Sequence, residues 1–506
     1  MDPVVKPRDD LSRLSYRDLI AVSSEMLQWI PWSSHGMTWV ETGVFAWNDA
    51  KLKEKKTMKK HIATLLLALT FLPCVSSAAL NLELTRGTNA KIPVAVLPFA
   101  WHGTQKQPPL KLSDIIQHDL YLSGRFQLAN AQGTTAKPLP NKVADINFAD
   151  WRKQGLNSLV LGALQAQGDN QYQVRFSLVN LFKNKQQIAP QSSDNAGFNP
   201  QNNPVLASNV FTVKTAQLHD AAHRIANQVY QQLIGSPGFF TSKIAYVLVK
   251  KKTGQTRQYS LMVANFDGSD PQTVLSSSQP IMSPAWSPDR KTLAYVSFQT
   301  GVPAIYTFDL IHETRRLIAS YAGINGAPAW SPDGKKLAIV LSKSSNAKIY
   351  QLDLSNGRLT QLTFGWASDT KPSWSPDGAS LVFTSNRSGT PQIYQLNLAS
   401  KQVTKLSLRG IYNVDPAFSP DGQSVVFIHQ RATAYDVVIK NLNTKKMRYL
   451  TRGQMADSPS FSPNGGEVIY SVLINGQSRL ALITLSGNVQ ELLPAKSGDR
   501  VEPAWS

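Results

Sequence analysis

The stretch NGAPAWSPDGKKLAIVLSK, from Asn325 to Lys343, places a tight turn directly before an apolar run. Ser331-Pro332-Asp333-Gly334 has the chemistry of a type I turn, because proline fixes φ at the second position and glycine suits the fourth. The run from Leu337 to Leu341 is wholly apolar, which is typical of a short strand covered on both faces. The stretch therefore predicts β-structure with a turn leading into a buried strand.

The same motif recurs through the second half of the chain at an almost constant interval. Each unit adds a strand of alternating polarity, such as Tyr350 to Leu354, and a short strand after a turn such as Asn356-Gly357. The motif aromatic falls at Trp286, Trp330, Trp374, Phe418, Phe461 and Trp505, so the intervals are 44, 44, 44, 43 and 44 residues. Four strands in a period of this length predict a β-propeller blade. Each aromatic ring is expected to pack as a wedge between neighbouring blades.

The two ends of the repeat region predict the number of blades. Lys243 to Ser276 supplies three strands with no motif before them, whereas the last motif, PAWS, ends the chain. Five motifs with three further strands each begin at Pro284, Pro328, Pro372, Pro416 and Pro459. We therefore predict that the two ends complete one blade and close a six-bladed propeller over residues 241–506, which removes open sheet edges. Arg290 replaces the turn glycine of the first motif, so that turn should be less favourable.

A signal peptide is expected at residues 58–78. Met58-Lys59-Lys60-His61 is a basic start, Ile62 to Leu72 is an apolar run, and Ser76-Ser77-Ala78 offers small residues for cleavage before Ala79. The apolar run is too short to span a bilayer comfortably. Residues 1–57 precede this signal, and we interpret them as a misassigned upstream extension, with a genuine cytoplasmic extension as the alternative.

Composition excludes several kinds of site. Cys74, the only cysteine, lies within the expected signal peptide after a proline that disfavours lipidation, so the mature chain would have no disulfide and no thiolate metal site. Residues 1–78 hold ten Lys/Arg and eight Asp/Glu, so their removal leaves 42 basic and 25 acidic residues and changes the net charge from +19 to +17. Because the basic residues are scattered, we interpret them as a solvated surface near anionic envelope components and expect no nucleic-acid partner.

Residues 91–235 are expected to form an α/β domain of ordinary size. IPVAVLPF reads as a buried strand, and LSDIIQHDLYLSGRF as a helix with Ser113 as N-cap. LNSLVLGALQAQ and YQVRFSLVNLF read as a hairpin about Gly168, followed by a polar loop from Gln186 to Pro204. VFTVK and a helix from Ala216 to Leu233 complete the domain, and residues 235–240 link it to the propeller.

The sequence contains one pair of residues with the spacing of a metal site, but we do not interpret it as one. His219 and His223 lie four residues apart on the last predicted helix, which is the spacing of zinc hydrolases. No third ligand is evident nearby, so we interpret them as histidines on a solvated helix face, with no metal. A propeller-capped serine peptidase would need a G-x-S-x-G turn, which the sequence lacks. We expect no enzyme activity and no cofactor.

The order of signal peptide, α/β domain and six blades resembles the TolB family of the Tol-Pal system. The resemblance rests on PVAVLPF (Pro93 to Phe99), QPIMSPAWSPD (Gln279 to Asp289), NGAPAWSPDGKKLA (Asn325 to Ala338) and the closing PAWS, and it covers about residues 79–506. It implies a non-enzymatic periplasmic scaffold that supports outer-membrane integrity and envelope constriction at cell division. It also implies binding of the lipoprotein Pal through the propeller and of TolA through the mature N-terminus. Other outer-membrane or peptidoglycan-associated proteins are further candidate partners. We expect the mature chain of this protein to have no membrane span. The alternative is a propeller hydrolase or lyase that uses the central channel.

The mature N-terminus, residues 79–90, reads as a strand with one apolar face that could add to the sheet edge of a partner. By resemblance this is the TolA-binding segment, with Ala79, Leu80, Asn81, Leu82, Glu83, Leu84 and Thr85 as the contact residues. The alternative is a strand paired within its own domain, and alternation between the two states would make the segment a switch.

Diversified residues just before each propeller motif are expected to ring one mouth of the channel and to bind Pal. They are Gln279, Met282, Asn325, Gly326, Asp369, Lys371, Asn413, Asp415, Asp457, Arg500 and Glu502. These positions are mostly polar and differ between blades whose motifs scarcely vary, as expected of a protein-binding face. Ordinary loop variability is the competing interpretation.

Overall fold

The computed structural model describes residues 90–506 except 130–138, 169, 184–202, 252–256, 344–345 and 408–409. The predicted upstream extension, signal peptide and N-terminal strand lie outside the described residues, as does most of the predicted loop 186–204. Within them, no helix is both long and apolar enough to cross a membrane.

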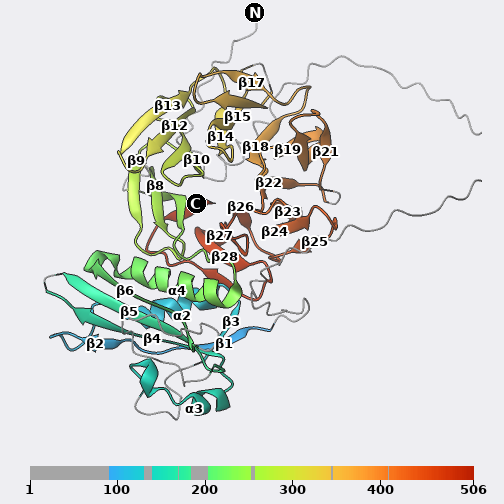
Figure 1. Ribbon diagram of the computed structural model, residues 1–506. Helices are drawn as coiled ribbons and strands as arrows, with labels where there is room; N and C mark the ends of the chain where they lie inside the picture. Colours follow the sequence, from blue (N-terminus) through green and yellow to red (C-terminus); the bar gives the residue numbers. More distant parts are fainter. Residues whose placement is uncertain are drawn as a thin grey trace, which may run out of the picture. The chain divides into compact units, whose positions relative to one another are not determined.

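The α/β domain is built on one mixed sheet. Its strands are β1 (Ile92–Val96), β2 (Ala100–His102), β3 (Phe126–Leu128), β4 (Ser158–Ala166), β5 (Gln171–Asn180) and β6 (Val205–Lys214). They run in the order β3-β1-β4-β5-β6, and β2 also pairs with β4. The helices are α2 (Leu112–Leu122), α3 (Phe148–Lys153) and α4 (Leu218–Ile234), with 3-10 turns η3 (Val143–Asp145) and η5 (Thr215–Gln217). Helices α2 and α4 cover the sheet face that is turned to the propeller (Figure 1).

Most predicted elements of this domain are confirmed. The hairpin is β4–β5, paired antiparallel from Ser158 and Asn180 to Ala166 and Tyr172. The prediction of Ser113 as N-cap was wrong: α2 begins at Leu112, and Lys111 occupies the N-cap. The apolar Leu112 is fully buried in the core, so the helix starts early enough to place it there.

The propeller consists of six four-stranded antiparallel sheets, as predicted. Five of them run in chain order: β10 (Ile281–Trp286), β11 (Thr292–Ser297), β12 (Ala304–Asp309), β13 (Thr314–Ala319); β14 (Asn325–Trp330), β15 (Lys336–Leu341), β16 (Lys348–Asp353), β17 (Leu359–Gln361); β18 (Asp369–Trp374), β19 (Ser380–Ser388), β20 (Thr390–Asn397), β21 (Val403–Lys405); β22 (Asn413–Phe418), β23 (Ser424–Arg431), β24 (Ala434–Asn441), β25 (Met447–Tyr449); and β26 (Ala456–Phe461), β27 (Glu467–Ile474), β28 (Gln477–Thr484), β29 (Gln490–Leu492). The sixth joins β30 (Asp499–Trp505) to β7 (Lys243–Lys251), β8 (Arg257–Asn265) and β9 (Gln272–Ser277). The first and last strands of the propeller segment, β7 and β30, therefore close the ring.

The repeated turn is a small hydrogen-bonded unit. In the second copy the N–H of Gly334 donates to the carbonyl of Ser331 at 2.9 Å, and the Ser331 hydroxyl donates to Asp333 Oδ1 at 2.6 Å. The same hydroxyl accepts from the N–H of Lys336, which opens the next strand. Arg290 closes its turn with φ of 61°, the left-handed region that its glycine counterparts occupy at lower cost.

The motif aromatics lie between blades, as predicted, and three tryptophans add a hydrogen bond. The indole N–H of Trp330, for example, donates at 3.2 Å to the carbonyl of Ala285 on the preceding inner strand. Trp286 and Trp374 make the equivalent bond, to Ala504 and Ala329. The inner strands are thus joined to their neighbours by both packing and polar contacts.

The α/β domain and the propeller share one apolar core. Residues of α2, α4 and the sheet pack with Phe239 and Phe240 of the linker and with Phe266 and Trp505 of the propeller. The aromatic rings of Phe239 and Trp505 meet edge to face at 5.6 Å. Polar groups buried at this boundary are therefore held in a water-poor environment.

Candidate functional site

Each inner strand of the propeller has the same break in its pairing, at the residue before the motif proline. The register with the next strand shifts across this point, as between Gly326 and Ala329 of β14. The residue before the proline adopts a left-handed backbone, which non-glycine residues rarely do. The six residues are Ser283 (φ 51°), Ala327 (42°), Lys371 (50°), Asp415 (54°), Ser458 (49°) and Glu502 (51°). An uncommon conformation repeated in every blade is a built feature of the fold.

These six residues, here called the channel ring, line a cavity of about 340 Å³ together with the motif prolines. Lys371 Nζ lies 4.0 Å from Glu502 Oε1, and Glu502 accepts a hydrogen bond from the backbone N–H of Ser283 in the neighbouring blade. Burial opposes the charge of Lys371, but Asp415, Glu502 and Asp457 outweigh it and raise its pKa. Burial, with the adjacent Asp415, raises the pKa of Asp457 to about 8. The channel thus concentrates three carboxyl groups around one amino group.

The structure places six of the eleven predicted Pal-contact residues on the ring or directly before it. Lys371, Asp415 and Glu502 belong to the ring itself. Met282, Gly326 and Asp457 each lie one residue before a ring position on their inner strands. Gln279 is exposed on the loop before β10, where its N–H donates to Ser277 Oγ.

Four predicted residues stand five positions before the motif aromatic and are buried inside their blades: Asn325, Asp369, Asn413 and Arg500. Asn325 donates to carbonyls of the loop that precedes it. Asp369 accepts from Arg387 Nη2 at 2.9 Å, and Asn413 Oδ1 lies 2.8 Å from Nδ1 of His429. These side chains do not face the channel, so any effect of theirs on a partner would be indirect, through the loops that they support.

Sequence reasoning missed three ring residues, Ser283, Ala327 and Ser458. A constant offset of three residues before the motif aromatic would have found them, because that offset also gives Lys371, Asp415 and Glu502. The prediction also missed exposed apolar side chains on the loops that cross from one blade to the next. Phe364 and Trp366, before β18, are 67% and 66% exposed, and Ile411, before β22, is 69% exposed. The sequence signal that could have indicated them is the presence of aromatic residues within otherwise polar turns.

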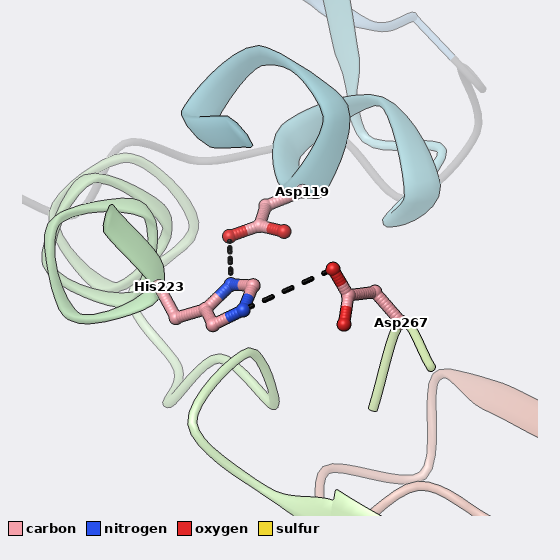
Figure 2. A group of neighbouring side chains, drawn as sticks. All are labelled: Asp119, His223 and Asp267. Atoms are coloured by element: carbon pink, nitrogen blue, oxygen red, sulfur yellow. Dashed lines mark hydrogen bonds and ion pairs between the residues drawn. The ribbon is translucent and has the colours of Figure 1, made fainter. Parts of the chain in front are cut away.

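A second polar site lies at the boundary between the domains, and it corrects our interpretation of His219 and His223 as solvated. His223 is only 1% exposed. Its Nδ1 lies 2.8 Å from Oδ2 of Asp119 on α2, and its Nε2 faces Asp267 Oδ2, from the turn after β8, at 3.9 Å (Figure 2). His219 instead pairs with Asp270, 3.4 Å from its Nδ1. The two histidines therefore do not share a ligand.

The three residues Asp119, His223 and Asp267 offer possible metal-ligand atoms within 4.8 Å of one another. Asp119, however, already holds Nδ1 of the ring, the role that an outer-shell carboxylate takes beside a metal-bound histidine. A cation at Nε2 would then have Asp267 as its one further protein ligand among the three, fewer than zinc centres use. We therefore interpret the cluster as a proton-binding group.

The electrostatics of the cluster agree with proton binding. Burial raises the pKa of Asp119 to about 6, against the lowering effect of His223. Burial alone would lower the pKa of His223, but its hydrogen bond to Asp119, with the charges of Asp119, Asp267 and Asp220, raises it. Asp119 Oδ1 and His223 Nε2 are buried without a hydrogen-bond partner. A proton added to Nε2 would meet the Asp267 carboxylate.

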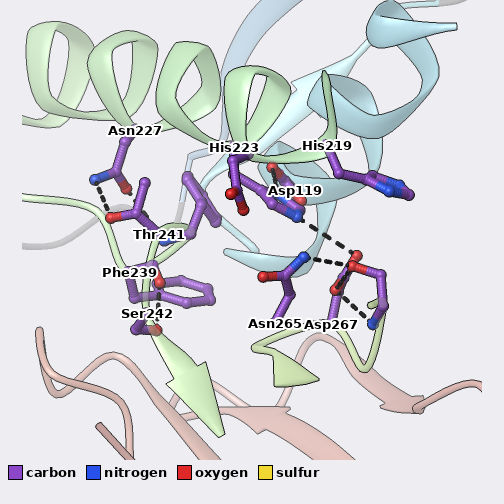
Figure 3. Close-up of polar contacts among 12 residues, drawn as sticks. Asp119, His219, His223, Asn227, Phe239, Thr241, Ser242, Asn265 and Asp267 are labelled. Carbon is purple, nitrogen blue, oxygen red and sulfur yellow. Dashed lines mark hydrogen bonds and ion pairs between the residues drawn. The ribbon is translucent and has the colours of Figure 1, made fainter. Parts of the chain in front are cut away.

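The linker to the propeller runs along the same helix. The Asn227 side chain of α4 accepts from the N–H of Phe240 at 3.1 Å and donates to Thr241 Oγ1 (Figure 3). Gly238 passes so close to Asn227 that a Cβ there would lie 2.4 Å from its Oδ1. The start of the propeller is therefore fixed to α4 a short distance from His223.

Two family models match the chain. The TolB amino-terminal domain matches residues 80–187, and the TolB beta propeller domain matches residues 230–506. The chain is 52% identical to the Tol-Pal system protein TolB of Coxiella burnetii, over 88% of this chain and 98% of that protein. It is 48% identical to the protein of the same name from Thioalkalivibrio sulfidiphilus, over 89% and 98%. The crystal structure of TolB from Acinetobacter baumannii matches with a TM-score of 0.69 at 34% identity, over 82% of this chain and 96% of that one.

Proposed function

Because the chain belongs to the TolB family of Tol-Pal system proteins, we propose that it is a periplasmic scaffold without catalytic activity. It binds the lipoprotein Pal through the propeller and TolA through residues 79–85. In this role it supports outer-membrane integrity and envelope constriction at cell division. The observation that carries the Pal assignment is the channel ring, with the exposed apolar side chains on the loops that precede β18 and β22.

The channel ring has the properties of a recognition surface. Its backbone is fixed by the pairing break in every blade, whereas its side chains differ and include Lys371, Asp415 and Glu502. Fixed charges orient a partner, and exposed aromatics such as Phe364 and Trp366 can supply the apolar contacts that dominate binding energy. A partner that spans the mouth and the ring would use both.

Charge substitutions test the Pal assignment. Lys371→Glu and Glu502→Gln should each weaken Pal binding by about tenfold or more, since charged contacts at interfaces are worth about 1.4 kcal/mol or above. The measurement is calorimetric titration of residues 79–506 with Pal, alongside thermal unfolding. Arg316→Glu, on the exposed outer strand β13, is the matched control and should leave the affinity unchanged.

The charge-swapped variant Lys371→Glu/Glu502→Lys distinguishes loss of a direct contact with Pal from loss of the internal ion pair between the two residues. It restores an ion pair between positions 371 and 502, but the acid at 371 then faces Asp415 and Asp457, and the lysine at 502 cannot accept from Ser283 N–H. The unfolding midpoint should therefore recover in part while Pal affinity stays low. Recovery of both would contradict the proposed surface, because the loss would then come from the broken internal pair. An enzyme using the channel would keep Pal binding in these variants and lose turnover.

Deletion of residues 79–85 tests the TolA assignment. The shortened chain should lose TolA binding, because the alternating leucines Leu80, Leu82 and Leu84 would no longer add a strand to the partner. Pal binding and the unfolding midpoint of the propeller should stay as they are, which a pull-down with each partner and a thermal melt would measure. Undiminished TolA capture by the shortened chain would rule the segment out.

A further inference from the structure

The boundary between the α/β domain and the propeller carries three histidine–carboxylate pairs of the same polarity. In every pair the histidine comes from α2 or α4 and the carboxylate from the propeller. The pairs are His118 Nε2–Glu491 Oε1 at 3.3 Å, His219 Nδ1–Asp270 Oδ2 at 3.4 Å and His223 Nε2–Asp267 Oδ2 at 3.9 Å. These boundary pairs place imidazole rings, each able to gain a second N–H, opposite carboxylates across one seam.

The buried pair responds most strongly to a proton. With Nδ1–H donating to Asp119, a neutral His223 turns the lone pair of Nε2 toward the Asp267 carboxylate (Figure 2). That arrangement is repulsive, and it leaves a buried nitrogen without a partner. Protonation converts Nε2 into a charged donor aimed at Asp267, while Asp119 holds the ring in place. Asp267 is itself fixed, because its Oδ1 accepts from the N–H and hydroxyl of Ser269.

We propose that the boundary pairs form a proton-operated latch, in which protonation of the histidines tightens the docking of the α/β domain on the propeller. Loss of the protons weakens the docking and lets the boundary open locally. The His118 and His219 pairs are partly exposed, so each contributes less than the buried pair. The latch is distinct from the proposed partner sites and does not depend on them.

Other charged groups at the seam leave this direction unchanged. Lys243 of the propeller pairs with Asp220 of α4 at 3.4 Å, a contact across the seam that involves no histidine. His219 and His223 stack with centroids 5.9 Å apart, so their mutual repulsion opposes double protonation. Asp270 and Asp267, one beside each ring, offset that repulsion, and Asp119 adds a third carboxylate.

The pH window follows from the buried pair. Asp119 and His223 both have raised pKa values in the folded protein, so the docked state binds more protons than the open state. Stability of docking is then greatest in acid. It falls between about pH 3.8 and about pH 6 as Asp119 deprotonates, and again above pH 6.5 through the raised pKa of His223. The seam should be tighter at pH 5.5 than at pH 8.

Hydrogen–deuterium exchange of the whole mature chain tests the latch, with labelling times scaled for the intrinsic rate at pH 5.5 and pH 8. Peptides covering residues 114–126, 264–272 and 486–493 should be several-fold better protected at pH 5.5 than at pH 8, because the raised pKa of His223 favours the docked state in acid. Peptides from β18–β20, away from the seam, should be protected equally at the two pH values. Equal or weaker protection of the seam in acid would overturn the proposal.

Variants identify the groups responsible. His118→Gln/His219→Gln/His223→Gln should abolish the pH ratio, and Asp267→Asn alone should reduce it strongly while leaving the His223–Asp119 bond in place. The single substitution keeps the result decisive if the triple variant fails to fold, because an asparagine Oδ1 can still accept from Ser269. His312→Gln is the matched control, since His312 pairs with Asp309 at 3.0 Å within one blade. A full pH ratio in Asp267→Asn would contradict the latch.

Discussion

At the residue scale, the fifth full repeat carries a buried acid where the other turns have none. Glu467 takes the position held by Thr292, Lys336, Ser380 and Ser424 in the other repeats. Its side chain is 2% exposed, and its Oε2 accepts from Ser462 Oγ at 3.0 Å. Burial raises the pKa of Glu467 to about 8, so the folded protein holds this carboxyl protonated at neutral pH. The unfolded chain releases that proton, so stability falls as pH rises from about 4.5 to about 8.

Glu467→Gln should therefore stabilise the propeller, and increasingly so at higher pH. Glutamine keeps an acceptor for Ser462 without the ionisable group, and each pH unit in the window changes the free energy of unfolding by up to about 1.4 kcal/mol. Urea unfolding at pH 5 and pH 8 would measure the difference between variant and parent. Lys336→Gln, at the equivalent position of β15, is the control and should leave the pH profile unaltered. Parallel profiles for parent and Glu467→Gln would show that the buried acid does not titrate there.

At the element scale, the inner strands use two interchangeable ways of joining blades. Where the motif aromatic is Trp330, its indole N–H bonds the carbonyl of Ala285 in the preceding blade. Where it is Phe418, no indole exists, and the backbone N–H of Phe418 donates instead to the hydroxyl of Ser373 at 3.2 Å. Ser373 occupies the position of Ala285 in its own motif, and the N–H of Trp505 makes the same bond to Ser460 at 3.0 Å. The serine one blade earlier therefore provides this contact, whichever aromatic follows it.

Trp330→Phe should cost about 1–3 kcal/mol, since it removes one hydrogen bond and part of a large, partly buried ring. Adding Ala285→Ser should restore about 1 kcal/mol by rebuilding the bond that Ser373 makes to Phe418. Denaturant unfolding of the two variants and of Ala285→Ser alone, as a double-mutant cycle, isolates this coupling. Strict additivity in the cycle would mean that the serine does not replace the indole bond.

The blades could be predicted from sequence because their signals are local. Ser331 to Gly334 specify a turn with residues that contact one another, and the fixed interval of Trp330 and its counterparts sets the register of every blade. The short β2, β3 and α3 were missed because three to six residues show no reliable period. The partners of His223 could not be predicted either, since Asp119 and Asp267 lie far from it in sequence and only tertiary packing brings them together.

At the scale of the whole molecule, the fold depends on the pairing of the first and last strands of the propeller in one sheet. β30 pairs with β7, the backbone N–H of Ser506 donates to the carbonyl of Lys243 at 2.9 Å, and Trp505 Nε1 donates to Ser242 Oγ at 2.7 Å. Trp505 also packs in the core shared with the α/β domain. One strand therefore closes the propeller and supports the domain boundary.

Deletion of residues 499–506 should lower the unfolding midpoint of the whole molecule, because it leaves the inner edge of β7 unpaired and empties the place of Trp505. A synthetic peptide of residues 499–506, added to the shortened chain, should raise the midpoint again in a concentration-dependent way, since it restores the missing strand by mass action. A peptide with Trp505→Ala is the control and should rescue far less. Thermal melts with increasing peptide would measure both. If the shortened chain melted like its parent, or both peptides rescued equally, ring closure through β30 and Trp505 would not be what stabilises the molecule.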